Sequence, residues 1–113
     1  MAQALGMIEV YGYTTSIVVA DLVAMTADVK VVAIDKNKPA NAESCAVPLV
    51  MVVKFMGNAG AVQSALDAGV KEAKSRGLYI TSKVIAGLDD QVQWFADLNA
   101  TGKDKLRNME LSE

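Results

Sequence analysis

Apolar residues recur along the chain at two spacings, which predict strands and helices in turn. Runs rich in β-branched residues and bounded by Gly, Pro or Asn are typical of strands, whereas apolar residues three or four positions apart indicate helices. Strands are therefore expected at residues 5–11, 29–35, 48–55 and 78–85, and helices at about 14–27 and 58–76. The order strand–helix–strand, repeated once, predicts an α+β ferredoxin-like fold (βαββαβ), a four-stranded antiparallel sheet with both helices on one face.

Local signals place the ends of these helices. Thr14, Thr15 or Ser16 is expected to cap the first helix, although the β-branched residues at 17–19 also suit a strand. Gly57 with Asn58 is typical of a turn and a helix start, and Gly77 of a helix end. The second helix has small residues on its inner face, so it can approach a sheet or a neighbouring subunit closely.

A third helix is expected after Gly87. Leu88, Val92, Phe95 and Leu98 repeat at helical intervals, and two aspartates at 89 and 90 lie in the first turn. This helix could dock on its own domain, or it could bind a partner or cargo. We therefore expect residues 1–87 to form the main domain and residues 88–113 to form a C-terminal helix with a polar tail.

Composition adds an expectation of self-association. The chain has 113 residues, 52% of them hydrophobic, and a domain this small buries only part of its apolar surface. One sheet face and the sheet edges are also left uncovered in the predicted fold. Eleven basic and thirteen acidic residues are scattered along the chain, which argues against nucleic-acid binding, and no apolar run is long enough to suggest a membrane span.

The usual catalytic and metal-binding groups are missing. The chain has no His, and Cys45 is its only cysteine, so Ser–His and Cys–His pairs and the common zinc and haem sites are excluded. The carboxylates of Glu9, Asp21, Asp35 and Asp67 show no spacing that pairs them on one face. We expect no catalytic residue, no metal and no cofactor, and therefore a protein that is not an enzyme.

Several segments resemble one family. These are ALGMIE at residues 4–9, Ala20-Asp21, the run G-N-A-G-A-V with A-L-D-A-G across residues 57–69, and Lys83-Val84-Ile85. Together they are similar to the single-domain shell proteins of bacterial microcompartments. The resemblance implies a ferredoxin-like variant that forms six-membered rings, which tile with other shell subunits around encapsulated enzymes inside the cytoplasm.

The resemblance also implies a pore. In the family, the loop between the second and third strands lines the ring axis, which here gives Lys36, Asn37, Lys38, Pro39, Ala40, Asn41, Ala42, Glu43 and Ser44. Six copies of such donors and charges would favour small polar metabolites. The stretch DKNKPAN at residues 35–41 is similar to shell subunits of glycyl-radical-enzyme compartments, for example those that metabolise choline or propanediol.

Two departures from the family concern the edge of the ring. Met25 stands where the family usually has a lysine, four positions after Asp21, and Ala86-Gly87-Leu88 replaces the usual Pro-Arg-Pro-like segment. Asp21 and Met25 are thus the expected edge residues. Because of the two departures, we expect rings of this chain to tile more weakly or with a different geometry.

Two other functions remain open from the sequence. A small regulatory protein with the same scaffold could bind a ligand through the loop at residues 36–46. A small oligomeric enzyme could work with carboxylates alone, without His or metal.

Overall fold

The computed structural model describes residues 3–37 and 49–98. Its elements follow the order β1 (Ala4–Tyr11), α1 (Tyr13–Thr26), β2 (Val29–Asn37), β3 (Val50–Gly57), α2 (Ala59–Ser75), β4 (Tyr79–Ile85), a 3₁₀ turn η2 (Asp90–Val92) and α3 (Gln93–Asp97). The four strands form one sheet in the order β2-β3-β1-β4, and each neighbouring pair is antiparallel. The predicted fold class is therefore confirmed.

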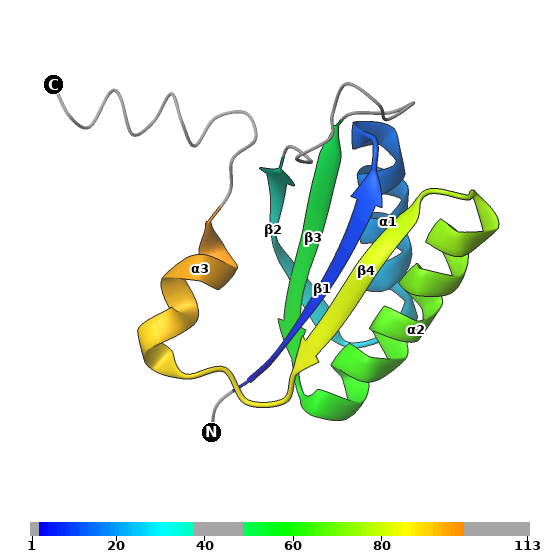
Figure 1. Cartoon of the computed structure of the whole chain (residues 1–113). Coiled ribbons are helices and arrows are strands. Elements are labelled where there is room, and N and C mark those ends of the chain that lie inside the picture. Colours follow the sequence, from blue (N-terminus) through cyan, green and yellow to red (C-terminus); the bar gives the residue numbers. More distant parts are fainter. Residues whose placement is uncertain (1–2, 38–48, 99–113) are drawn as a thin grey trace, which may run out of the picture.

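The sheet separates a large core from a small one. Strand residues alternate between faces, so Ile8 and Val10 of β1 point toward the helices while Leu5 and Met7 point away. On one face, α1 and α2 bury the larger core with residues such as Val53, Phe55, Val19 and Val62 (Figure 1). On the other face, α3 covers a smaller cluster made by Leu5, Met56, Leu88 and Ala96.

The ends of α2 lie where the sequence predicts them. Asn58 caps the helix, because its Oδ1 accepts a hydrogen bond of 2.8 Å from the backbone N–H of Ala61. After the helix, Gly77 adopts a φ of +71°, a left-handed conformation that suits glycine best. A local signal at each end was sufficient to predict this element.

The predicted cap of α1 is wrong. The helix begins at Tyr13 after Gly12, and no side chain caps it. Gly12 has a φ of +91°, which lets the chain reverse directly from β1 into the helix. Thr15 and Ser16 therefore lie buried inside the first turn.

Strand β2 is longer than expected, and β3 starts and ends two residues later than expected. Lys36 and Asn37 were expected to belong to an irregular loop, but they pair with Met51 and Val50 in the β2–β3 ladder. β3 starts at Val50 and continues to Gly57, which pairs with Val29 of β2 and Ala4 of β1. Pairing between strands, rather than local propensity, sets these ends.

The third helix is much shorter than its spacing predicts. The 3₁₀ turn η2 and the five-residue α3 replace a regular helix over residues 88–98. Leu88 is buried and Phe95 packs against the small core, but Val92 and Leu98 are exposed. α3 therefore docks on its own domain, which is one of the two roles expected for this helix.

Candidate functional site

The connection between β2 and β3 leaves the sheet at one end. Asn37 and Val50 are the last pair of the β2–β3 ladder, so the chain departs from β2 and returns to β3 side by side. Lys36 and Asn37 are exposed there, and the backbone N–H of Lys36 donates to Oδ1 of Asp35 at 2.8 Å. The other expected pore residues, Lys38 to Ser44, lie outside the described residues.

The two expected edge residues lie on α1, and Met25 is at the far end of the molecule from this connection. Helix α1 begins beside it, because Gly12 N–H donates to Leu49 O at 2.8 Å. Fourteen residues later α1 ends next to Val29, which pairs with Gly57 at the opposite end of the sheet. A helix of this length rises about 20 Å. Asp21 is exposed on this helix, and Met25 is 70% exposed near its end.

Helix α1 is unusual for a surface helix, since apolar residues occur on all its sides. Val19, Ala20 and Val23 face the core, while Tyr13 and Ile17 are 50% and 44% exposed on the outer side. A helix that is apolar all round is normally buried on all sides. The outer side of α1 therefore has the character of a contact surface.

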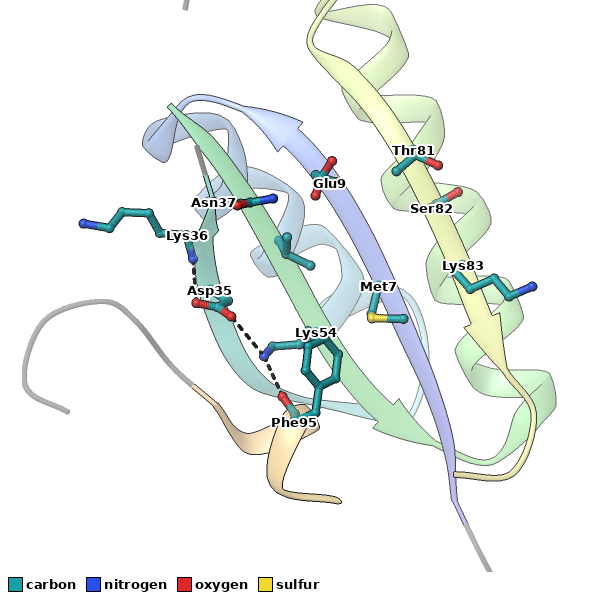
Figure 2. Close-up of a pocket in the computed structure, with 11 residues that line it drawn as sticks. Met7, Glu9, Asp35, Lys36, Asn37, Lys54, Thr81, Ser82, Lys83 and Phe95 are labelled. Carbon is teal, nitrogen blue, oxygen red and sulfur yellow. Dashed lines mark hydrogen bonds and ion pairs between the residues drawn. The ribbon is translucent and has the colours of Figure 1, made fainter. Parts of the chain in front are cut away.

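A hollow of about 480 Å³ opens on the sheet face that lacks α1 and α2 (Figure 2). Its floor combines apolar and charged side chains, and α3 borders it through Phe95. Its lining comprises Met7, Glu9, Asp35, Lys36, Asn37, Val52, Lys54, Thr81, Ser82, Lys83 and Phe95. Because it includes Lys36 and Asn37, the hollow extends to the end of the sheet where the β2–β3 connection leaves.

Lys54 is buried at the border between this hollow and α3. Its Nζ donates hydrogen bonds of 2.7 Å to the carbonyl oxygens of Phe95 and Leu98, at the C-terminal end of α3. Asp35 Oδ2 lies 3.7 Å from the same nitrogen, and the centroid of the Phe95 ring lies 4.6 Å from it. Phe95 O also accepts a hydrogen bond of 3.2 Å from the backbone N–H of Leu98. A cation at this position complements the partial negative charge of the helix C-terminus. Figure 2 shows Lys54 between Asp35 and Phe95.

Burial sets the protonation of Lys54. Desolvation lowers the pKa of its ammonium group, and the nearby carboxylates of Asp35 and Asp97 oppose this effect only in part. Lys54 is not among the site residues predicted from the sequence. A lone charge inside the apolar run VMVVKFMG was the available signal, because a buried strand tolerates a lysine only when it has partners.

Other site types have no support among residues 3–37 and 49–98. Within these ranges, no three His, Cys, Asp or Glu side chains gather closely enough to hold a metal ion. No helix there combines the length and apolar character needed to cross a membrane.

Comparison with known proteins gives a consistent result. The family model described as "BMC domain" matches residues 4–88. The chain is 32% identical over 92 residues to the bacterial microcompartment shell protein PduK of Citrobacter freundii, covering 81% of this chain and 54% of PduK. It is 34% identical over 94 residues to the bacterial microcompartment shell protein EutK of Escherichia coli (strain K12), covering 83% of this chain and 51% of EutK.

A solved structure shares the fold. It is the crystal structure of a microcompartments protein from Desulfitobacterium hafniense DCB, with a TM-score of 0.67 and 19% identity over 91% of this chain and 51% of that one. The chain spans about half the length of the curated relatives it matches. On the extent of the family match and the identity to two shell proteins, this chain belongs to the BMC domain family of bacterial microcompartment shell proteins.

Proposed function

We propose that this chain is a structural subunit of a bacterial microcompartment shell and that six copies form a ring around a central pore. Membership of the BMC domain family and the relatives named as shell proteins support the shell role. The subunit would act by assembly, without catalysis and without a cofactor. Other shell subunits would complete the facets.

The proposed ring rests on the separation of two features along the sheet. The β2–β3 connection leaves at one end, and the exposed Met25 lies toward the other. In a ring whose axis is near the connection, residues 36–44 would line the pore. Met25 and Asp21 would then lie toward the perimeter and meet neighbouring rings. The apolar outer side of α1 supports a subunit that is covered by other copies.

The pore would pass small polar metabolites. Lys36, Lys38 and Glu43 supply both charge signs, and a ring repeats each of them six times. We assign the enclosed pathway to a glycyl-radical enzyme, for example one acting on choline or propanediol, because DKNKPAN at residues 35–41 resembles subunits of those compartments.

The C-terminal part would stay attached to the shell domain. We keep residues 1–87 as that domain and 88–113 as the C-terminal helix with its tail, since β4 ends at Ile85 and η2 starts at Asp90. We also propose that this C-terminal part contacts encapsulated enzymes.

Native mass spectrometry and electron microscopy of the purified chain test the proposal. A six-subunit mass together with ring-shaped class averages would support it. A chain that stays monomeric or dimeric even at high protein concentration would overturn it.

A further inference from the structure

A row of polar contacts runs from α3 across the sheet to the start of the β2–β3 connection. Lys54 donates hydrogen bonds to the last carbonyls of α3, and its Nζ lies 3.7 Å from Oδ2 of Asp35. The other carboxylate oxygen of Asp35, Oδ1, accepts a hydrogen bond of 2.8 Å from the backbone N–H of Lys36. Figure 2 shows these contacts in sequence, with Lys54 and Asp35 between α3 and Lys36. One carboxylate thus connects the docked helix with the segment that leads into the connection.

We propose that Lys54 and Asp35 are positioning residues for the pore, because they link the docking of α3 to the position of Lys36, the first of the expected pore residues. This inference rests on the proposed ring, since only the ring makes the connection a pore. It requires two states of α3, docked and released. Release of α3 should loosen Lys36, and a change at Asp35 should loosen α3, because a coupling between two sites acts in both directions.

Release of α3 would change the surroundings of the Lys54 ammonium group. In the docked state the Lys54 side chain is fully buried, and the ring of Phe95 lies 4.6 Å from its nitrogen. Two opposite charges attract strongly where water is excluded. Without α3, water would reach the ammonium group, and the pair with Asp35 would become a surface ion pair, which contributes little. Asp35 would then be held less firmly, and so would its hydrogen bond to Lys36.

The short helix α3 is suited to a two-state role. Five helical residues are not stable alone, so the contacts of α3 with the sheet decide whether it stays docked. These contacts come from Leu88 and Ala96 in the smaller core and from the two hydrogen bonds of Lys54. Segments held by few contacts open locally at a lower free energy than the main core. Asp35 supports docking because it compensates the charge that α3 covers.

Lys36 lies where a small shift would reach the pore. β2 is an edge strand, so a neighbouring strand holds it on one side only. Lys36 and Asn37 are its last two residues and lead directly into the connection. The side chain of Lys36 is exposed there, while its backbone N–H is bonded to Asp35. In a ring, a change at Asp35 would therefore displace six cations near the axis together.

A double-mutant cycle tests the link from α3 to Lys36. Ala96→Glu should release α3, because it places a charge in the smaller core, and faster hydrogen exchange across residues 93–98 would report the release. Exchange of the Lys36 N–H, followed by NMR, should become about fivefold faster or more in this variant. Asp35→Asn keeps an acceptor for Lys36 but removes the charge that attracts Lys54.

In the Asp35→Asn background, Ala96→Glu should therefore change the exchange of Lys36 very little. Equal acceleration in both backgrounds would overturn the inference, because release of α3 would then act on β2 without Asp35. Circular dichroism checks that the variants remain folded. If Ala96→Glu does not fold, Leu88→Ala weakens the same cluster more gently and replaces it in the cycle.

The opposite direction gives an independent test. Asp35→Asn alone should speed hydrogen exchange across residues 93–98, although these residues are far from position 35 in the sequence. Asp67→Asn is the matched control, since it neutralises an exposed carboxylate on α2, the helix on the other face of the sheet, and should leave this exchange unchanged. No acceleration in Asp35→Asn, or equal acceleration in both variants, would overturn the inference.

Native mass spectrometry and conductance separate this inference from the proposed function, because the exchange measurements do not depend on the oligomeric state. In rings inserted in a planar bilayer, Lys54→Met should shift the conductance relative to the wild type while the six-subunit mass remains. A ring whose Lys36 exchange and conductance ignore these substitutions overturns the inference and leaves the ring. A wild-type chain that is monomeric overturns the proposed function, and with it the pore role of Lys54 and Asp35, even if α3 and Lys36 are linked.

Discussion

Gly69 lies where α2 approaches both β1 and α1. A Cβ atom built on this residue would lie 2.5 Å from Cδ1 of Ile8, 3.0 Å from Cγ2 of Val23 and 3.3 Å from Cγ1 of Val19. These contacts are too short for a well-packed core, so the helices would have to separate slightly. We expect Gly69→Ala to lower the free energy of unfolding by about 1–3 kcal/mol, measured by urea denaturation at a fixed protein concentration.

Gly60 provides the matched control in the same helix. The nearest atom to a Cβ there is Oδ1 of Asn58 at 3.6 Å, which is an ordinary contact. Gly60→Ala should therefore be neutral or should stabilise the protein by up to about 1 kcal/mol through helix propensity. Equal destabilisation by the two substitutions would show that close packing at Gly69 is not the cause.

Lys54 is a buried charge whose main protein partners come from two other elements. Asp35 of β2 forms the ion pair, and Asp97 of α3 adds a second negative charge nearby. Removing one member of such a group leaves the others without compensation. In Lys54→Met, the carbonyls of Phe95 and Leu98 lose the hydrogen bonds from Lys54, and Phe95 O keeps only the one from Leu98 N–H at 3.2 Å. We therefore expect faster hydrogen exchange across residues 93–98 than in the wild type.

The pH dependence of stability follows from the lowered pKa of Lys54. Between that lowered value and the ordinary lysine value of 10.5, the unfolded chain binds the proton and the folded chain releases it. The contribution of Lys54 to stability is therefore smallest below this window and rises with pH through it. A neutral amine still has two N–H donors for the two carbonyls.

We therefore expect the difference in unfolding free energy between wild type and Lys54→Met to shift in favour of the wild type as pH rises through this window. Urea denaturation of both proteins at several alkaline pH values measures this difference. Subtracting the unfolding free energy of the variant from that of the wild type removes the contribution of the other titrating groups. If Lys54→Met instead became more stable relative to the wild type as pH rises, this would contradict the burial of Lys54.

Among the elements, those with a local signal at each end could be predicted from the sequence. Asn58 and Gly77 bound α2, and runs rich in β-branched residues locate the strands. The end of β2 at Asn37 depends on pairing with Val50, and a single-sequence pattern does not specify such pairing. The contact between Lys54 and Phe95 joins residues 41 positions apart, so no local pattern could reveal it.

The spacing of residues 88–98 predicted a longer helix because periodicity says nothing about what caps an element. The observed helix is shorter at its start, because Asp89 caps the 3₁₀ turn η2 and α3 begins only at Gln93; it ends at Asp97, one residue before Leu98. Leu98 is consequently exposed, at 45%, although its spacing fits the apolar stripe. The pore and edge residues came from family resemblance, since neither Lys38 nor Met25 has a local feature that marks an assembly contact.

The last turn of helix α1 leads to a prediction about contacts between rings. Its last turn exposes Met25, and Asp21 lies one turn earlier on the same outer side. If the missing lysine at position 25 alone limits tiling, Met25→Lys should promote extended sheets. Negative-stain electron microscopy at matched concentration would show them, and Met25→Gln controls for the loss of the apolar side chain.

No change in assembly after Met25→Lys would point instead to residues 86–88 after β4. β4 pairs with β1 up to Ile85 opposite Leu5, and Leu88 N–H donates to Gln3 O at 2.9 Å. That segment is thus tied to the same end of the sheet as the end of α1. Either element could set the geometry between rings.

At the scale of the whole molecule, the sheet holds its two functional ends apart. The strands are antiparallel and similar in length, so one end gathers the β2–β3 connection and the start of α1, and the other gathers the end of α1 and the end of β4. A rise of about 3.3 Å per residue separates these ends by roughly 25 Å. Substitutions at the connection should therefore not disturb contacts at the opposite end.

This separation leads to a prediction for the pore. Replacing Lys38 or Glu43 with Ala should remove one charge from each of the six copies around the ring axis and so alter ion binding or permeability, while the six-subunit mass remains. Native mass spectrometry checks the mass, and conductance of rings inserted in a planar bilayer or ion binding by calorimetry checks the pore. If the Lys38 or Glu43 variants dissociate instead, the connection is a subunit contact, and the pore must be assigned to other residues.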